Sequence, residues 1–347
     1  MTSGGASESA ARLEVDRATI LAFRRRMGSL DERLPRSARS FRRAAWAGLQ
    51  DSVPRAAVLA LHARVEDVRP DDWNHRSLVQ LWGPRFSVFV VAAEDLALFS
   101  LGTLPDAERG RRRAVDLADA LEARLGGEER TYSAVGRDLG GHPNQLRYAG
   151  ATGRVLIRWD GARPPTVRVV PAPDIDPFDA RLELARRWLH VAGPTTPHAF
   201  ATWAGITPRG GRQTFEALGP ALTEVATPLG HAWILADDRP SFGDAASGRP
   251  APARLLSSGD PYLMVGDREL LVPDATHRRE LWPPGTVWPG GLLVDGELVG
   301  TWRRSGPKAT MHPWRTLTAT ELESVEAEAA SLPLPDGDTP VRVTWVD

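Results

Sequence analysis

The sequence predicts an α+β protein in which tandem winged-helix modules, each a helix-turn-helix followed by a two-stranded wing, precede a small β-barrel-like C-terminal domain. Two segments, 131–170 and 182–235, have the same order of helix, turn, helix and two strands. After about residue 250 the pattern changes to short strands and turns. The 347 residues also exceed one ordinary core of about 100–200 residues, so several domains are expected.

The chain begins with residues 1–12, which have neither the basic nor the apolar region of a signal peptide and are expected to form a disordered lead. Residues 13–104 follow, with mainly helical apolar spacing. One helix face is predicted from Ile20, Phe23 and Met27, and another from Ala56, Leu59, Ala60 and Ala63. We interpret this region as an N-terminal winged-helix module.

Residues 105–174 are predicted to be a second winged helix. The helices are expected at 132–139 and 143–149, separated by Gly140 and Gly141. Strands at 154–159 and 166–170 then form the wing, because both alternate and Asp160-Gly161 supplies a turn between them.

Residues 175–249 are predicted to be a third winged helix. A helix over 182–191 ends at Gly193-Pro194, and Thr196 and Thr207 are typical N-caps for the next two helices. Strands at 222–225 and 232–235 complete the module.

Residues 250–347 are predicted to form the β-rich C-terminal domain. The segment 292–299 is a hairpin around Asp295-Gly296, a pair suited to a tight primed turn. A late helix is expected at 320–330, within an acidic tail.

Composition excludes several chemistries. Cysteine is absent, so disulfides, thiolate metal sites and cysteine nucleophiles are ruled out. The eight histidines have no ligand spacing, and the common phosphate-loop, zinc-protease and serine-hydrolase motifs are missing, so no metal and no cofactor is expected. No apolar stretch approaches the roughly 20 residues that cross a membrane. We expect a soluble, cytoplasmic monomer.

Charge is unevenly distributed. The total of 43 basic and 44 acidic residues gives −1, which by itself argues against a general nucleic-acid binder. Between Arg12 and Arg43, however, there are ten arginines and four acids, whereas 316–347 holds seven acids and one arginine. Lys308 is the only lysine, so almost every basic side chain is an arginine. The planar guanidinium of arginine can donate two parallel hydrogen bonds to a phosphate or a base edge. A GC-rich genome would produce the same bias.

The predicted helix after Thr207 begins with Arg209, Arg212 and Gln213, and its counterpart in the second module carries Asn144, Gln145 and Arg147. These side chains can pair with phosphates and purine edges when such a helix enters the major groove of DNA. Exposed helix faces also carry such residues, and winged helices also bind proteins, so both interpretations stay open.

Several stretches together resemble the bacterial winged-helix DNA glycosylases of the AlkZ and YcaQ type. The resemblance covers about residues 15 to 305, in the order of that family. The matching segments are 47–57 (AGLQDSVPRAA), 61–65 (LHARV), 200–206 (FATWAGI), 253–256 (ARLL), 260–263 (DPYL) and 293–303 (LVDGELVGTWR). The resemblance implies tandem winged helices and a β-barrel around a concave basic DNA channel, and removal of alkylated or crosslinked bases from double-stranded DNA.

Hydrolysis of an N-glycosidic bond passes through an oxocarbenium-like sugar and needs a positioned water. In the family that water is held by a Gln-x-Gln or Gln-x-Asp motif. Gln50 matches the first position, and Ser52 stands at the second. On an extended strand these two residues share a face while Asp51 points away. A helix-start role for Gln50 is the structural alternative.

A second departure lies at 84–91, where relatives commonly read Arg-Gly-Thr-Leu-His. Arg85 is kept and Ser87 is a conservative change, but Phe86 replaces the glycine and Phe89 the histidine. Phe86 and Phe89 are more typical of a core than of base stacking, because the surrounding run is apolar throughout.

Further arginines are candidate DNA contacts by position. They are Arg42 and Arg43 before the motif, Arg55 and Arg64 after it, and Arg303 in the last matching segment. For Arg55 and Arg64 the alternative is pairing with nearby acids such as Glu66 or Asp67.

Three functions follow as hypotheses. The first is a DNA-binding protein of this family that engages duplex or alkylated DNA, with hydrolysis weakened or altered by Ser52. The second is an active alkyl-base glycosylase in which Gln50 positions the water. The third is a winged-helix transcriptional regulator or interaction scaffold.

Overall fold

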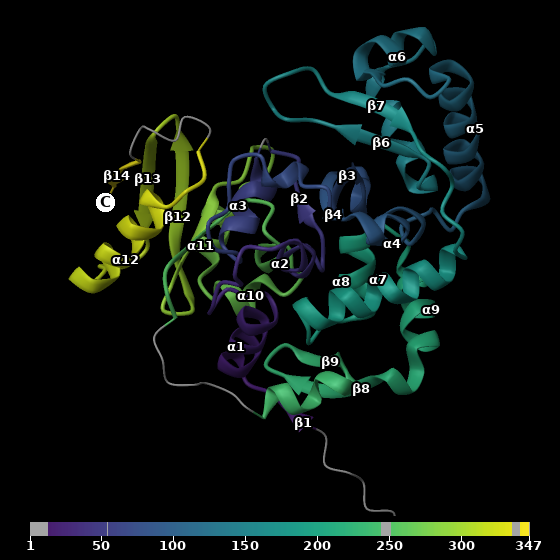
Figure 1. Ribbon diagram of the computed structural model, residues 1–347. Helices are drawn as coiled ribbons and strands as arrows, with labels where there is room; N and C mark the ends of the chain where they lie inside the picture. The colour runs from purple at the N-terminus through teal and green to yellow at the C-terminus, as the bar shows by residue number, and fades with distance from the viewer. Residues whose placement is uncertain (1–12, 54, 244–250, 335–340, 347) are drawn as a thin grey trace, which may run out of the picture.

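The computed structural model of the chain describes residues 13–53, 55–243, 251–334 and 341–346. The expected disordered lead at 1–12 and part of the acidic tail therefore lie outside the described residues. Within the described ranges the fold is mixed α+β, with four small sheets among the helices (Figure 1). No helix in these ranges is both long and apolar enough to cross a membrane.

The first described residues pair with a distant part of the chain. Strand β1 (Leu13–Glu14) lies parallel to β8 (Leu222–Thr227), which is antiparallel to β9 (Gly230–Leu235). Helix α1 (Arg17–Met27) packs beside this sheet, and Phe23 stacks on Phe242 with ring centroids 4.0 Å apart. The start of the predicted first module thus shares a core with residues predicted for the third.

The second sheet has the order β2-β4-β3 and is antiparallel. Its strands are β2 (Leu49–Gln50), β3 (Leu78–Trp82) and β4 (Val88–Ala92). Around it lie α2 (Ala38–Ala44), η1 (Asp72–Asn74), η3 (Ala93–Asp95), α4 (Leu96–Leu101), α3 (Ala56–His62) and η2 (Pro84–Phe86). The mainly helical expectation for this region was wrong at β3 and β4. Strand β4 is buried on both faces, so its sequence lacks the alternation that marks a half-exposed strand.

The third sheet has the order β5-β7-β6 and stands at the top of Figure 1 with the long helix α5 (Glu108–Leu125). The helices α6 (Tyr132–Asp138) and η4 (Pro143–Thr152) and the strands β5 (Arg130–Thr131), β6 (Val155–Arg158) and β7 (Thr166–Val169) complete it. The predicted elements lie where expected, except that η4 is a 3-10 helix.

Three helices precede the β8–β9 hairpin. They are α7 (Pro177–Ala192), α8 (Pro197–Ala204) and α9 (Pro208–Leu218), and the turns η5 (Gly219–Ala221) and η6 (Ala236–Phe242) flank the hairpin. Thr196 and Thr207 cap α8 and α9 as predicted, accepting hydrogen bonds from the backbone amides of Ala199 and Gly210.

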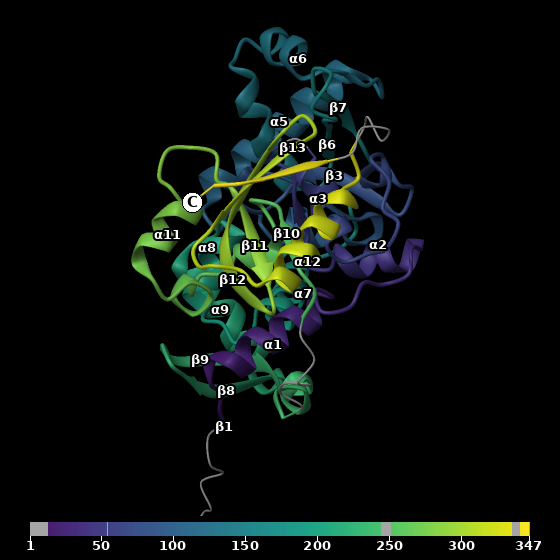
Figure 2. The ribbon, with the colours of Figure 1, turned by 90° about the vertical axis from the view of Figure 1, so that its left-hand side faces the viewer.

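The C-terminal region forms one sheet in the order β10-β11-β12-β13-β14. The strands are β10 (Arg254–Leu256), β11 (Gly290–Val294), β12 (Glu297–Ser305), β13 (Lys308–Pro313) and β14 (Arg342–Trp345). The sheet is open, because β10 and β14 are its two edges, so the expected barrel-like closure is not formed. Helix α12 (Ala319–Ala330) packs on it (Figure 2). The β11–β12 turn has positive φ at Asp295 and Gly296, as predicted.

Between β10 and β11 the chain forms η7 (Pro261–Leu263), α10 (Arg268–Leu271) and α11 (Ala275–Leu281). The largest hydrophobic cluster draws residues from both halves of the chain, among them Phe89, Trp188, Phe200 and Leu263. Trp188 stacks on Trp203 with ring centroids 4.2 Å apart. This shared core holds the sheets in fixed relation to one another.

Candidate active site

Gln50 lies at the end of β2, where it pairs with Phe89 of β4. The next amide, of Asp51, still donates to the carbonyl of Val88 at 2.7 Å, so the extended conformation continues past Gln50. Helix α3 begins only at Ala56, and the side chain that reaches its start is Asp51, not Gln50. The alternative of a helix-start role for Gln50 was therefore wrong.

Gln50 and Ser52 face a pocket of about 180 Å³. The wall comes from two regions of the chain, the β2–α3 turn and the loops before η7 and β11. The lining residues are Gln50, Ser52, Val53, Ala56, Ser258, Gly259, Thr286, Val287 and Trp288. A Cβ on Gly259 would lie 3.1 Å from Gln50 Cβ, so a glycine there allows the loop to close on the strand. The described lining residues include no carboxylate, imidazole or amine.

The Gln50 side chain is oriented by Arg85. The Arg85 guanidinium donates to Gln50 Oε1 at 2.8 Å, which requires the amide oxygen on that side. The amide nitrogen then faces Ser52 Oγ at 3.4 Å, a long contact. Asp51 points the other way and is buried, as the extended strand predicted.

Arg85 is itself fixed by the α8–α9 turn. Its guanidinium also donates to the carbonyl of Trp203. Gly205, with φ +75°, comes so close that a Cβ there would lie 2.8 Å from the Arg85 backbone nitrogen. Burial and, to a smaller extent, the nearby charge of Arg268 lower the pKa of Arg85 to about 10, so Arg85 stays protonated at neutral pH.

A second cavity of about 230 Å³ adjoins the first and shares Val53, Ala56 and Val287 with it. Arg303 and Arg304 of β12 line it. Burial lowers the pKa of Arg304, and the charge of Arg55 lowers it as well. The two arginines that line the cavity, Arg303 and Arg304, suit a phosphate group.

Neither departure at 84–91 seals the pocket. Phe89 is buried and packs near Phe99, with ring centroids 6.4 Å apart. Phe86 makes an edge contact with Tyr148, with centroids 4.8 Å apart. Both phenylalanines serve packing, the role that the apolar run favoured. Ser87 is half-buried between η2 and β4.

Arg64 is a structural residue and its expected contact with DNA was wrong. The side chain is 2% exposed and donates to both carboxylate oxygens of Asp260 at 2.7 Å. Asp260 has no exposed surface, so the pair is sealed inside the protein. The acids next to Arg64 in sequence, which the alternative named, are not its partners here.

Much of the basic stretch before Gln50 is also neutralised within the protein. Six of its arginines pair with carboxylates, namely Arg17, Arg24, Arg25, Arg33, Arg36 and Arg42. Arg43 lies against His190 and over the Trp46 ring, so it supports the interior rather than an open DNA surface. Arg42 remains accessible because its pair with Glu94 is exposed. The arginine-rich sequence therefore overstated the positive charge of this surface.

Arg209 and Arg212 are exposed on α9, and nothing in the described part of the chain joins them to the Gln50 pocket. Among the predicted site residues, the structure brings Gln50, Ser52 and Arg85 together and places Arg303 in the adjoining cavity.

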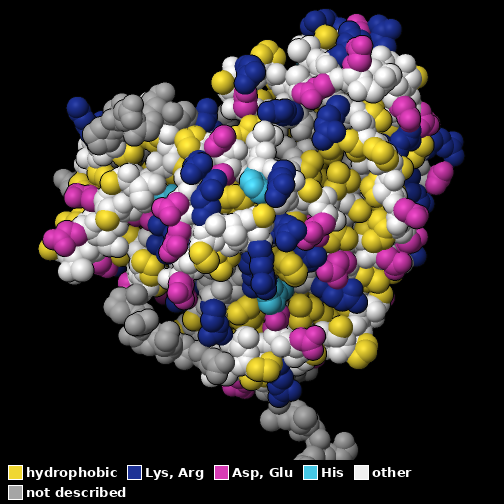
Figure 3. All heavy atoms as spheres, viewed as in Figure 1, with side chains coloured by type: hydrophobic (Ala, Val, Ile, Leu, Met, Phe, Trp, Pro, Cys, Tyr) yellow, Lys and Arg dark blue, Asp and Glu magenta, His cyan; other side chains and the backbone are white. Residues whose placement is uncertain are grey.

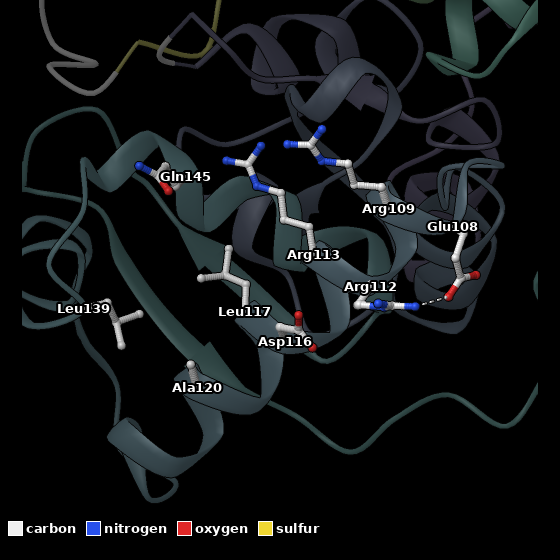
Figure 4. A pocket seen from close by; sticks show the side chains of 9 residues that line it. All are labelled: Glu108, Arg109, Arg112, Arg113, Asp116, Leu117, Ala120, Leu139 and Gln145. Atoms are coloured by element: carbon white, nitrogen blue, oxygen red, sulfur yellow. Dashed lines mark hydrogen bonds and ion pairs between the residues drawn. The ribbon is translucent and has the colours of Figure 1, made fainter.

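A larger groove of about 850 Å³, which sequence analysis missed, runs along α5. Arg109 and Arg113 extend from α5 in the same direction, while Arg112 pairs with Glu108 at 3.2 Å (Figure 4). Arg113 lies over the Tyr148 ring, 4.1 Å from its centroid. The run RGRRR at 109–113 was the available signal. Elsewhere on the face in Figure 3, basic and acidic side chains are interspersed.

The loops 258–259 and 286–288 were also missed as parts of the pocket. They lie more than 200 residues from Gln50 in the sequence, and their small and apolar side chains have no motif of their own.

The fold and the site define a mixed α+β protein with a small neutral pocket in which an amide and a hydroxyl can hold a water molecule. Comparisons with known proteins agree with this class. A family model described as DNA glycosylase AlkZ-like matches residues 43–333. The chain belongs to the AlkZ-like DNA glycosylase family.

One curated relative is an interstrand DNA cross-link repair glycosylase of Streptomyces sahachiroi, 26% identical over 175 residues. The match spans 48% of this chain and 46% of that relative, less than half of its length. Among solved structures, the DNA glycosylase AlkZ of Streptomyces sahachiroi superposes with a TM-score of 0.79. It is 18% identical and the superposition covers 96% of this chain and all of that one, so the likeness concerns the fold.

Proposed function

We propose that this protein binds duplex DNA and hydrolyses the glycosidic bond of N-alkylated, positively charged bases, with Gln50 and Ser52 positioning the water. The observation that carries the proposal is the oriented amide of Gln50, held by Arg85 at 2.8 Å and open to a pocket that Ser52 also lines. Family membership supports DNA as the substrate.

The chemistry of the pocket sets the kind of base. A purine alkylated at a ring nitrogen such as N7 already carries positive charge and leaves without protonation, so a water held near C1′ suffices. One lone pair of Gln50 Oε1 remains beyond the bond to Arg85, and Ser52 Oγ is the second acceptor on the same side. The described residues that line the pocket include no acid that could protonate a neutral leaving base.

A second candidate is binding to damaged DNA without hydrolysis. The short Ser52 side chain favours it, because a hydroxyl ends two bonds short of the amide that occupies this position in relatives. This candidate uses the same DNA surface and differs only in the chemical step.

DNA recognition is proposed to use tandem winged helices. We assign them to 13–104, 105–174 and 175–249, each of which contributes strands to a small sheet beside short helices. Near the pocket, Arg55, Arg303 and Arg304 are the proposed phosphate contacts. Arg42, Ser87, Arg209 and Arg212 remain proposals for the flanking DNA. Duplex DNA carrying alkylated or crosslinked bases is the proposed partner.

Base release tests the proposal. The protein is incubated with duplex DNA containing N7-methylguanine, and abasic sites are scored as strand breaks after alkaline treatment. We expect release by the wild type and a loss of about 100-fold or more in Gln50→Ala, the size typical of a lost catalytic interaction. Asn74→Ala, at an exposed position on η1 outside the pocket lining, is the amide control and should keep full activity. If the wild type and Gln50→Ala both released N7-methylguanine only at the background rate, hydrolysis would be contradicted and the second candidate function, binding without hydrolysis, would remain.

A further inference from the structure

Asp51 separates Gln50 from Ser52 in sequence and points into the interior, where it is 3% exposed. Each carboxylate oxygen accepts one hydrogen bond. Oδ1 accepts from the backbone amide of Ala57 at 3.0 Å, at the start of α3. Oδ2 accepts from Gln80 Nε2 at 2.7 Å. The residue between the two pocket side chains is thus anchored from both sides.

Gln80, on β3, continues this chain of contacts and is 5% exposed. Its Oε1 accepts from the backbone amide of Trp159 at 2.6 Å, and its Nε2 donates to the carbonyl of Trp159 at 3.1 Å. A single side-chain amide therefore satisfies both backbone groups of Trp159. The Trp159 amide can only face an oxygen, which fixes the orientation of Gln80 and directs its Nε2 toward Asp51.

Trp159 directly follows β6 and begins the loop 159–165 that joins β6 to β7 in the hairpin. The hairpin projects from the upper part of the molecule on the side of the β10–β14 sheet (Figure 1). Arg158, Arg163 and Arg168 are exposed on it. A wing with exposed arginines is suited to the DNA backbone.

We propose that Asp51, Gln80 and the Trp159 backbone form a buried coupling that sets the position of the Gln50 strand according to the position of the β6–β7 hairpin. Asp51 and Gln80 are positioning residues in this inference, which rests on the proposed function. The physical reason is that movement of the hairpin away from β3 would leave buried donors and acceptors unpaired. The hairpin and β2 therefore move together, and engagement of DNA by the hairpin holds Gln50 in register with the substrate.

A swap of the two side chains tests the coupling. In Asp51→Asn, either the Ala57 backbone amide or Gln80 Nε2 faces an NH₂ group instead of an oxygen. In Gln80→Glu, the carboxylates of residues 51 and 80 face each other. The double variant Asp51→Asn/Gln80→Glu restores a donor facing an acceptor between residues 51 and 80 and keeps one buried carboxylate, although the Trp159 carbonyl still lacks the donor that Gln80 Nε2 supplies. Asp72→Asn is the matched control, because Asp72 is also a buried, paired carboxylate but accepts from the Arg36 guanidinium and the Arg69 backbone amide, which lie outside β2 and the hairpin.

The single-turnover rate of N7-methylguanine release from duplex DNA is measured as a function of protein concentration. We expect each single variant to lower the maximal rate about tenfold with little change in the half-saturating concentration. The double variant should be faster than Gln80→Glu, because the contact between residues 51 and 80 is restored, and Asp72→Asn should stay within about twofold of wild type. Additive losses in the double variant would overturn the coupling.

Hydrogen exchange gives a readout that does not need hydrolysis. In each single variant, amides of residues 49–57 and 155–169 should exchange faster together, and in the double variant both should return toward wild type. Faster exchange at only one of these two segments would contradict the inference. Absence of base release by the wild type would instead count against the proposed function, while the exchange data would still decide the coupling.

Discussion

At the scale of single residues, the sequence was sufficient to find Gln50 and to place Ser52 on the same face. The alternation of an extended strand carries that information. The sequence could not show that Arg85 orients the Gln50 amide, because that contact joins residues 35 positions apart through two side chains. It also could not show that Arg64 is buried against Asp260, 196 positions away.

Asp51 gives a prediction about pH. Burial raises the pKa of Asp51 to about 7, although the hydrogen bonds from Ala57 and Gln80 and the charge of Arg55 act in the opposite direction. In the unfolded chain the pKa of Asp51 is near its ordinary value of 3.8. Between these two values the folded state binds more protons than the unfolded state, so the contribution of Asp51 to stability falls as pH rises.

Urea unfolding as a function of pH checks this. We expect the wild type to lose stability relative to Asp51→Asn as pH rises from about 4 to about 7, and the difference to level off above that range. If the difference instead grew in favour of the wild type with rising pH, the Asp51 carboxylate would be stabilised by its hydrogen bonds more than it is penalised by burial.

At the scale of elements, the caps, the hairpins and the turn at Asp295-Gly296 could be predicted because their signals are local. Strand β4 could not, because burial on both faces removes alternation. The parallel pairing of β1 with β8 could not be predicted either, since two residues carry no pairing signal.

The joint between α3 and η7 gives a prediction about stability. Arg64 just after α3 and Asp260 before η7 form a fully buried pair. Removal of one partner leaves a buried charge, so Arg64→Met is expected to lower the free energy of unfolding by about 3–5 kcal/mol. Chemical denaturation measures the loss.

The control is Arg42→Met, because the Arg42–Glu94 pair is exposed and its partners lie 3.3 Å apart. That variant should change stability by less than about 1 kcal/mol. If Arg64→Met also changed the free energy of unfolding by less than about 1 kcal/mol, other groups would have to stabilise the buried charge of the Asp260 carboxylate.

At the scale of the whole molecule, net charge was a poor guide to a DNA surface. Six of the arginines before Gln50 are paired with carboxylates of the protein, whereas Arg109 and Arg113 on α5 lie along an open groove. Pairing depends on which acids the fold brings close, and the sequence alone does not give that. The repeated pattern of helix, turn, helix and two strands likewise could not predict that four small sheets in the described residues are arranged around a shared core.

The α5 groove gives a prediction about DNA binding. If it contacts the backbone of the flanking duplex, Arg109→Gln/Arg113→Gln should reduce the slope of log K against log salt by about 2, because each phosphate contact contributes about 0.9. Fluorescence anisotropy with an undamaged duplex measures the slope. Arg76→Gln/Arg186→Gln, which removes equal charge at exposed positions outside the groove lining and outside the proposed DNA contacts, is the control. An equal slope for the groove variant and the wild type would exclude the groove from the DNA surface.

The most direct test of the Gln50 pocket compares bases that differ in charge. Single-turnover release is measured for N7-methylguanine, which is cationic, and for O6-methylguanine, which is neutral, in the same duplex sequence. Because the described lining of the pocket holds no acid, we expect release of the cationic base to be faster by about 100-fold or more and to depend on Gln50. Equal release of both bases, or release of the cationic base that persists in Gln50→Ala, would contradict the assignment of this pocket as the active site.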